Sequence, residues 1–415
     1  MKLIHNDYRR SFYLLLSSQL FAILGNGISR FSIVWWITTA YHSGIITSFQ
    51  MIAATLPGII LGPLLGPLID KLSRKNILLF CNVSNLIILF CLWVLFNFSS
   101  VNLITLTLYG FIASSLLSMQ QPALISSCSS MILEQKKGKL AGLQELLNAL
   151  GMVFSPIIAG YLIVVLKIQQ ILFLNLSFFM LAVVLLVFTN VPKKEFGKED
   201  HNHFLSEHIV MLYEGFQFIK KRKLLKALLL LFFIVNICCA VQPILPLYVT
   251  NDLLKGPVTL AHLELSLGIG LIIGSILNAL LIIRKEKEKV ILFSLIVCAL
   301  IEMGLGLFVD VSWSTLLIGF FGFVLPFINA TSTSIWLEVV PNHLQGRVFS
   351  IRTTFAQMGI PIGFLLGGAI ADITNASIVF ISGGLLLLLT AIFFKLSGSL
   401  RTLNIESQKR IQETL

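Results

Sequence analysis

Residues 62–79 read Gly-Pro-Leu-Leu-Gly-Pro-Leu-Ile-Asp-Lys-Leu-Ser-Arg-Lys-Asn-Ile-Leu-Leu. This stretch places a short charged loop, from Asp70 to Lys75, between two apolar runs that are each long enough to cross a bilayer. A soluble protein has no physical reason to flank so short a loop with two such runs. The stretch therefore predicts two membrane-spanning helices joined by a tight connection.

The whole chain has the composition of a membrane protein. Of its 415 residues, 56% are hydrophobic and 12% are charged, about half the charged fraction of an average soluble domain. Because lipid offers the backbone no hydrogen bonds, every long apolar run is expected to be an α-helix. Twelve runs qualify as spans: 11–40, 45–69, 76–98, 101–127, 140–166, 169–190, 225–250, 259–283, 289–309, 313–338, 347–372 and 376–397.

The formal net charge is +11, and the basic residues that produce it are unevenly divided between the two sides of the predicted membrane. If the amino terminus is cytoplasmic and the loops alternate, only Arg30, Lys167 and Lys255 of the 30 Lys and Arg residues lie outside the cytoplasmic side. This is the positive-inside bias, and it predicts that both termini are cytoplasmic. The basic loops are expected to meet anionic lipids of the inner leaflet. Nucleic acid is not expected as a partner.

A polar linker divides the chain into two halves. The predicted organisation is an amino-terminal six-helix bundle over 1–190, a linker over 191–223 with an amphipathic helix at 204–222, and a carboxy-terminal bundle with a cytoplasmic tail over 224–415. Gly138-Lys139 in the first half recurs as Gly346-Arg347 in the second, a shift of about 208 residues (346 − 138). Two repeated six-helix halves are typical of transporters that bind substrate near the membrane midplane.

Two motifs resemble the major facilitator superfamily. The stretch from Gly66 to Lys75 is similar to its Gly-x-Leu-x-Asp-x-x-x-Arg-Lys loop between the second and third helices. The stretch 146–160, with Gly151, Pro156 and Gly160, resembles the glycine-rich motif in the fifth helix of its antiporters. Small residues let helices approach closely, and proline kinks a helix. The resemblance implies an all-α membrane fold of twelve helices in two pseudo-symmetric halves, working by alternating access.

Within that superfamily the chain most resembles the macrolide-efflux group of bacterial exporters. The residues that carry this likeness are the first loop, Glu214-Gly215, Pro243, Pro246 and 346–350. The likeness implies a proton-driven exporter of lipophilic or amphipathic, macrolide-like compounds in the bacterial cytoplasmic membrane. The fourth span lacks the Arg that many drug–proton antiporters have there.

The resemblance also assigns a gating role to the residues around the first loop. In the family, the carboxylate that matches Asp70 faces the amino end of the eleventh helix, here near Arg347. A carboxylate there gains ~0.3–1 kcal/mol from the helix dipole and would hold the cytoplasmic side shut. Alternatively, Asp70 is a solvated loop acid. Arg74 and Lys75 are expected either to pair with Glu134 or to serve topology alone.

Arg30 is the most informative single residue, because it lies inside the first predicted span. An Arg at the centre of a membrane helix costs ~2.5–3.5 kcal/mol on insertion scales, so it should face the protein interior and have a partner. Asn26 lies one turn earlier on the same face. Arg30 is expected to bind an anionic substrate group or hold a carboxylate charged. The alternative is that it extends to the outer interface near Trp35 and Trp36.

Two carboxylic acids fall within later spans. Glu302 in the ninth span is a candidate proton carrier, because a buried carboxyl group can gain and lose a proton as access alternates. Glu264, beside His262 in the eighth span, lies near an outer helix end, where a solvated role is expected.

The polar lining of a cavity is expected from the first, fourth, seventh and tenth spans, although each of these residues alone is typical of an interhelical hydrogen bond. This predicted lining comprises Asn26, Gln120, Asn236, Gln242 and Asn329. No phosphate loop, nucleophile elbow or metal-ligand cluster is present in the sequence, so no cofactor, metal or enzymatic activity is expected.

Three functions stay open from the sequence. The first is a monomeric transporter that exports a small amphipathic molecule in exchange for protons. The second is a transporter of an anionic metabolite or siderophore that recognises its substrate through Arg30. The third is a membrane protein that does not transport, such as a sensor or a lipid-modifying enzyme.

Overall fold

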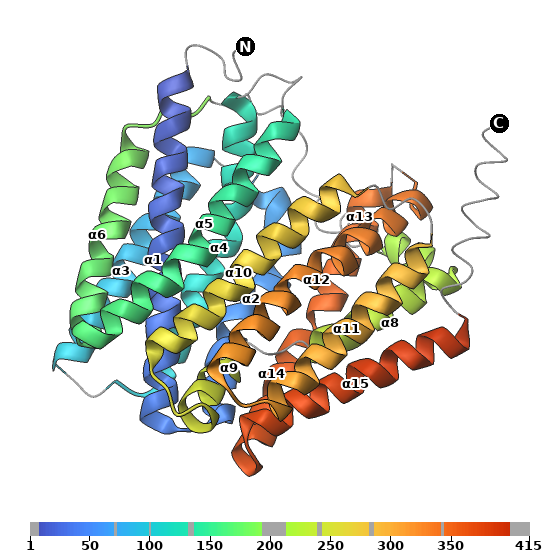
Figure 1. Cartoon of the computed structure of the whole chain (residues 1–415). Helices are drawn as coiled ribbons and strands as arrows, with labels where there is room; N and C mark the ends of the chain where they lie inside the picture. Colours follow the sequence, from blue (N-terminus) through green and yellow to red (C-terminus); the bar gives the residue numbers. More distant parts are fainter. Residues whose placement is uncertain are drawn as a thin grey trace. The chain divides into compact units, whose positions relative to one another are not determined.

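A computed structural model describes residues 8–69, 73–98, 101–131, 137–192, 213–238, 243–281, 286–341 and 344–398, without the side chains of 62–69, 137–142 and 145. Every regular element in these ranges is helical, and they contain no strand (Figure 1). The principal elements are α1 (Arg9–Tyr41), α2 (Gly44–Ile69), α3 (Arg74–Phe98), α4 (Leu103–Met131), α5 (Lys137–Val165), α6 (Ile168–Val187), α8 (Lys223–Cys238), α9 (Leu245–Leu247), the π-helix η3 (Tyr248–Asp252), α10 (Pro257–Leu280), α11 (Lys287–Leu307), α12 (Val311–Val339), α13 (Gln345–Gln357), α14 (Gly359–Ile373) and α15 (Ala376–Ser397).

Most of these helices are long and apolar enough to cross a membrane. Eleven candidate spans lie in the described part of the chain, with α13 and α14 together forming one of them. They coincide with eleven of the twelve predicted spans. The predicted seventh span, 225–250, corresponds to α8 followed by α9 and η3, and residues 239–242 between them lie outside the described ranges. The predicted all-α membrane fold is confirmed.

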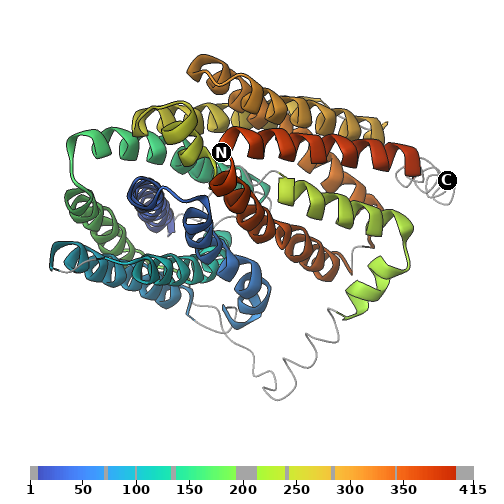
Figure 2. The ribbon, with the colours of Figure 1, turned by 90° about the horizontal axis from the view of Figure 1, so that it is seen from below.

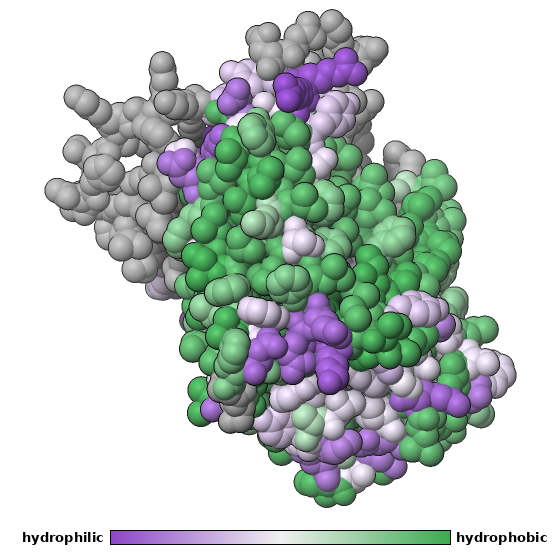
Figure 3. Space-filling model, turned by 90° about the vertical axis from the view of Figure 1, so that its left-hand side faces the viewer, coloured by the Kyte–Doolittle hydropathy of each residue, from purple (hydrophilic) through white to green (hydrophobic). Residues whose placement is uncertain are grey.

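The surface agrees with insertion in a bilayer. On the face seen in Figure 3, a broad apolar band has hydrophilic residues gathered on both sides of it. Large apolar side chains such as Phe98, Ile104, Phe173 and Leu396 are more than half exposed. In water this exposure would be unfavourable, but hydrocarbon is as apolar as these side chains. The band therefore matches the lipid-facing surface of a membrane protein.

The chain divides into two compact units. The first unit comprises residues 1–197 and 255–265, and the second comprises 198–254 and 266–415. Helix α10 thus begins in the first unit and continues in the second. The amphipathic helix predicted at 204–222 overlaps a helical stretch at 213–220, and its earlier part lies outside the described residues.

Helix α1 is the centre of the first unit. Seen from below, it lies among α2, α4, α5 and α6, all of which contact it (Figure 2). Its 33 residues extend about 50 Å, more than the ~30 Å hydrocarbon core needs. Two apolar clusters pack around it, one including Phe12, Leu16 and Leu124, the other including Ile33, Ile37 and Leu172.

Small residues allow α1 and α5 to pack closely. A Cβ atom added to Gly27 would lie 2.3 Å from Oγ of Ser155, and one added to Gly151 would lie 2.0 Å from Cγ2 of Ile23. Farther along α5, a Cβ on Gly160 would lie 2.5 Å from Cβ of Ala261 in α10. Pro156 lies inside α5 between these contacts. Residues 151–160 therefore form the surface by which α5 meets both α1 and α10.

The second unit has one large apolar core, built from α8, α11, α12, α13 and α15. Trp336 of α12 is fully buried within it. At one end of the unit, the hydroxyl of buried Tyr248 donates to the carbonyl oxygen of Leu305 at 2.9 Å, and Oδ2 of Asp252 accepts from the backbone N–H of Ser377 at 2.7 Å. The π-helix η3, which contains Tyr248 and Asp252, is thereby tied to α11 and α15.

Candidate substrate site in the first unit

A pocket between α1, α2 and α4 contains about 560 Å³ of empty space, part of which is open to solvent. All three helices belong to the first unit. One part of its wall is apolar, with Ile33, Val34, Met51 and Leu117. The polar part is formed by Asn26, Ser29, Arg30, Gln50, Tyr109 and Ser114. Such a lining of mixed polarity suits an amphipathic small molecule.

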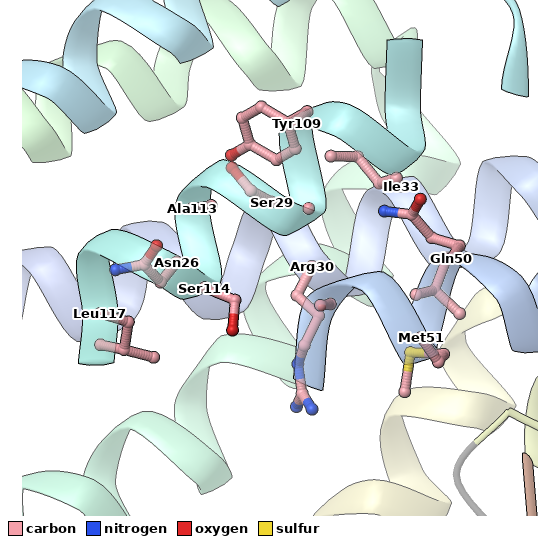
Figure 4. A pocket seen from close by; sticks show the side chains of 13 residues that line it. Asn26, Ser29, Arg30, Ile33, Gln50, Met51, Tyr109, Ala113, Ser114 and Leu117 are labelled. Atoms are coloured by element: carbon pink, nitrogen blue, oxygen red, sulfur yellow. The ribbon is translucent and has the colours of Figure 1, made fainter. Parts of the chain in front are cut away.

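Arg30 is the only residue in the lining that carries a charge at neutral pH. Its side chain is exposed, and with the described residues it makes no hydrogen bond or ion pair. In Figure 4 its guanidinium extends in the direction opposite to Tyr109 and Ser29. Asn26 lines the same pocket and donates from Nδ2 to the carbonyl oxygen of Ala22, 3.0 Å away in its own helix. The structure thus brings the two predicted residues of the first span to one pocket.

Gln50 of α2 is held against the backbone of α4. A Cβ atom on Gly110 would lie 2.7 Å from Nε2 of Gln50, so a larger residue there would displace this amide. Gln50 is 4% exposed, and its Oε1 has no hydrogen-bond partner among the described residues. A buried acceptor without a partner is unfavourable, and a ligand that donates a hydrogen bond would relieve this.

The wall behind Arg30 is a hydrogen-bonded group that joins three helices. Asn175 of α6 donates from Nδ2 to the carbonyl oxygen of Gly25 at 2.8 Å and also to the hydroxyl of Ser29. Tyr109 of α4 hydrogen-bonds to the same Ser29, beside which Figure 4 shows it. These contacts hold α1, α4 and α6 together, so this side of the pocket is already formed without a ligand.

A carboxylate on α10 lies within the electrostatic influence of Arg30. The first part of α10 belongs to the first unit, where Ala261 meets Gly160, and Nε2 of His262 lies 3.4 Å from the hydroxyl of Tyr161 in α5. Glu264 follows on the same helix, is half-buried, and lies within electrostatic range of Arg30. The sequence placed Glu264 near solvent at a helix end, whereas the structure makes it the carboxylate whose charge Arg30 influences.

Gln120 is located away from the pocket. It is fully buried, and its Nε2 lies 3.2 Å from Oε1 of Gln19 in α1 and 3.2 Å from Oδ1 of Asn82 in α3. Interhelical hydrogen bonds of this kind contribute about 0.6–2 kcal/mol in membranes. Gln120 therefore joins three helices to one another.

The predicted residues of the second unit that the structure describes lie on α8, α11 and α12. Asn236 of α8 is half-buried and donates to the carbonyl oxygen of Phe232 at 2.8 Å, and Asn329 of α12 is exposed. Glu302 of α11 is 1% exposed, and its Oε2 would lie 3.0 Å from a Cβ on Gly383 of α15. Gln242 lies outside the described residues.

The residues of the predicted gate are only partly described. Asp70 and Glu134 lie outside the described ranges, and of Gly66 only its place in α2 is described. Nη1 of Arg74 donates to the carbonyl oxygen of Ser126 at 2.9 Å, and Nζ of Lys75 donates to that of Val187 at 2.8 Å. Both cations thus lie near the carboxyl ends of α4 and α6, where the helix dipole favours positive charge.

Arg347 has a partner that sequence reasoning did not pair with it. It lies in the first turn of α13, and its Nη1 forms an ion pair with Glu214, which belongs to the helical stretch 213–220. Gly215, next to Glu214, permits this approach, because a Cβ there would lie 3.3 Å from Cβ of Arg347. The quoted motifs Glu214-Gly215 and Gly346-Arg347 are therefore two sides of one contact.

The polar lining residues Ser29, Gln50, Tyr109 and Ser114 lie outside the predicted set. Gln50 lies in the second predicted span, whereas the expected lining came from the first, fourth, seventh and tenth spans. No group of three or more His, Cys, Asp or Glu side chains in the described ranges could hold a metal ion.

Solved transporter structures share this fold. The nucleoside transporter NupG superposes with a TM-score of 0.72 at 14% sequence identity, over 93% of this chain and 98% of that one. A bacterial homologue of the human lysosomal transporter Spinster, in an inward-facing and unoccupied conformation, gives a TM-score of 0.71 at 11% identity, over 97% and 98%.

Curated relatives align over almost the full length. Macrolide efflux protein A of Streptococcus pyogenes is 24% identical over 414 residues, covering 97% of this chain and 99% of the relative. Multidrug efflux pump Tap of Mycolicibacterium fortuitum is 21% identical over 415 residues, covering 97% and 99%. The family model described as Major Facilitator Superfamily matches residues 15–357 and 240–412. The protein is therefore a multi-pass membrane transporter that belongs to the major facilitator superfamily.

Proposed function

We propose that the protein exports lipophilic or amphipathic compounds across the bacterial cytoplasmic membrane. The observation that carries this proposal is the nearly full-length similarity to proteins named as macrolide and multidrug efflux pumps. The pocket in the first unit supports it, because its wall combines Arg30 and Gln50 with apolar side chains such as Met51 and Leu117. A hydrophobic body with a polar group would satisfy both parts of that wall.

The driving force is exchange for protons, and the mechanism is alternating access between the two membrane sides. Glu302 supports proton exchange, because it is the only carboxylic acid among the described residues that is buried in the protein. A buried carboxyl group can alternate between its protonated and its ionised form as solvent access changes. The transported substrate is a small molecule. The basic cytoplasmic loops contact anionic lipids of the inner leaflet. The protein functions as a monomer.

Inside-out membrane vesicles provide the test, since they turn the cytoplasmic face outward. The vesicles are energised so that their interior becomes acidic, and a fluorescent reporter follows the internal pH while macrolides and other amphipathic drugs are added. Drug-dependent loss of internal protons, absent from vesicles without the protein, is the expected result. If no compound in the panel moves protons or is accumulated, the protein is not a proton-coupled exporter of such compounds.

A further inference from the structure

The pocket between α1, α2 and α4 is positively charged and contains an unsatisfied acceptor. Arg30 contributes the only formal charge of the lining and has neither a hydrogen bond nor an ion pair with the described residues. Gln50, buried on the opposite helix, has no partner at Oε1 in the same part of the chain. The pocket therefore offers a ligand the cationic N–H donors of Arg30 on α1 and the single acceptor oxygen of Gln50 on α2.

Glu264 acts as a distant counter-charge for Arg30. It lies within electrostatic range of the guanidinium, but no ion pair within bonding distance joins the two residues. The contacts of Ala261 with Gly160 and of His262 with Tyr161 hold this part of α10 against α5. An anionic group inside the pocket could approach Arg30 more closely than Glu264 does, and it would then compete with Glu264 for the guanidinium.

We propose that this pocket binds an amphipathic carboxylate, with its acidic group on Arg30 and a neighbouring N–H or O–H donor on Oε1 of Gln50. Guanidinium and carboxylate pair with two parallel hydrogen bonds, which favours this anion over a neutral group. The apolar body of the ligand lies against Ile33, Val34, Met51 and Leu117. The inference rests on the proposed function, since it names the class of substrate for the same site.

Four fluorescent probes with one apolar body test the recognition. They are N-(2-naphthoyl)glycine, the neutral N-(2-naphthoyl)glycinamide, the cationic N-(2-naphthoyl)ethylenediamine, and N-(2-naphthoyl)sarcosine, which keeps the carboxylate but lacks the N–H. Their binding to the purified full-length protein in lipid nanodiscs is measured by titration at pH 7 without a proton gradient. The glycine probe is expected to bind at least tenfold more tightly than the amide and the cation. Equal binding of these three probes would overturn the inference.

Three variants assign the contacts. Arg30→Gln should remove the tenfold preference for the glycine probe over its amide, while the amide still binds and thereby shows that the pocket is intact. Glu264→Gln should strengthen binding of the glycine probe several-fold and leave the amide unchanged, because the competing carboxylate is gone. Gln50→Leu should make the glycine and sarcosine probes bind alike. Lys167→Gln, which removes an exposed cation outside the pocket, is the matched control.

The variants also define the outcomes that contradict the inference. If Lys167→Gln weakens the glycine probe as much as Arg30→Gln does, the preference comes from the overall charge of the protein. If Glu264→Gln weakens that probe, the two groups do not compete for Arg30. Because binding is measured without transport, absent carboxylate selectivity together with active drug export in vesicles would overturn only this inference. Selective binding without any export would overturn only the proposed function.

Discussion

Single glycine and serine residues determine how closely α1 approaches its neighbours. Gly27 and Ser155 face each other across α1 and α5, and Gly110 leaves room on α4 for the amide of Gln50. In a membrane, where apolar association gains nothing over contact with lipid, such close packing supplies much of the attraction between helices. The shape of the pocket between α1, α2 and α4 and the packing of α1 thus depend on the absence of side-chain atoms at a few positions.

Gly27→Ala is expected to destabilise the first unit. The new methyl group would lie 2.3 Å from Oγ of Ser155, and overpacking of this kind costs about 1–3 kcal/mol. Thermal unfolding of the purified protein in detergent, followed by tryptophan fluorescence, should show a lowered Tm. Adding Ser155→Gly should restore most of the loss, because it removes the atoms that clash.

Gly58→Ala is the matched control for that experiment. No atom lies within 4 Å of a Cβ at Gly58, which is also within a helix, so the Tm should stay the same or rise slightly. A Gly27→Ala protein that unfolds like the wild type, or a double variant that is no more stable than Gly27→Ala, would contradict the predicted contact.

Glu302→Gln is expected to abolish drug-dependent proton movement. The amide has nearly the same shape as the carboxyl group but cannot gain or lose the proton, and the site is tight, with Gly383 close to Oε2. Binding of drug should persist, and the Tm should not fall, because no charge has to be buried. The assay is proton release in inside-out vesicles together with drug binding in nanodiscs.

Glu286→Gln provides the same chemical change at an exposed position just before α11. Its ion pair with Lys289 is solvent-exposed and contributes at most about 1 kcal/mol, so coupled transport should continue. Undiminished proton release by Glu302→Gln would show that another group carries the proton.

Helix ends are the parts of the elements where polar contacts concentrate. Arg74 and Lys75 bind carbonyl oxygens near the ends of α4 and α6, and Asp310 accepts backbone N–H groups at the start of α12. Asp252, at the end of η3, accepts the backbone N–H of Ser377 at the start of α15, which is far from it in the sequence. The contacts of Lys75, Asp310 and Asp252 satisfy backbone groups that the helices themselves leave unpaired.

Asp252→Ala is expected to loosen the first turn of α15. The carboxylate accepts from both the backbone N–H and the hydroxyl of Ser377, and losing an acceptor at a helix start costs about 0.5–2 kcal/mol. Hydrogen–deuterium exchange should become faster in peptides that contain Ser377, while exchange in α12 stays unchanged. Asn251→Ala, at the exposed neighbouring position, should have no such effect. Equal exchange in both variants would show that Asp252 does not stabilise this turn.

At the scale of the whole molecule, the distribution of basic residues predicts which side of the membrane each loop faces. Lys167 and Lys255 are exposed at loops predicted to be external, and Lys220 and Lys289 are exposed at positions predicted to be cytoplasmic. Basic residues near the ends of spans stay on the cytoplasmic side. Both termini should consequently be cytoplasmic.

Cysteine labelling tests this orientation in a protein whose six native cysteines have been replaced. Lys167→Cys and Lys255→Cys should react with a membrane-impermeant maleimide in intact cells. Lys220→Cys and Lys289→Cys should react only in inside-out vesicles. Labelling of Lys220→Cys in intact cells would reverse the predicted orientation.

The pattern of apolar and charged residues predicted the helices, and local motifs predicted the family. A run such as 76–98 must form a helix in lipid whatever its neighbours are, because its backbone has no other source of hydrogen bonds. Motifs such as Gly151, Pro156 and Gly160 are local too, so they can be read without knowing the tertiary contacts. The cost of placing Arg30 within a membrane span likewise marked it as a residue that needs a polar environment.

The tertiary structure alone decided which polar side chains contact one another. Gln50, Asn26 and Gln120 look alike in sequence, but Gln50 and Asn26 line the pocket, whereas Gln120 bonds to Gln19 and Asn82. The influence of Arg30 on Glu264 likewise depends on how α10 packs against α5. A polar residue in an otherwise apolar helix is expected to face away from lipid, and this can be read from the sequence. Its hydrogen-bonding partner depends on the rotation and spacing of the neighbouring helices. Those are set by packing between distant parts of the chain.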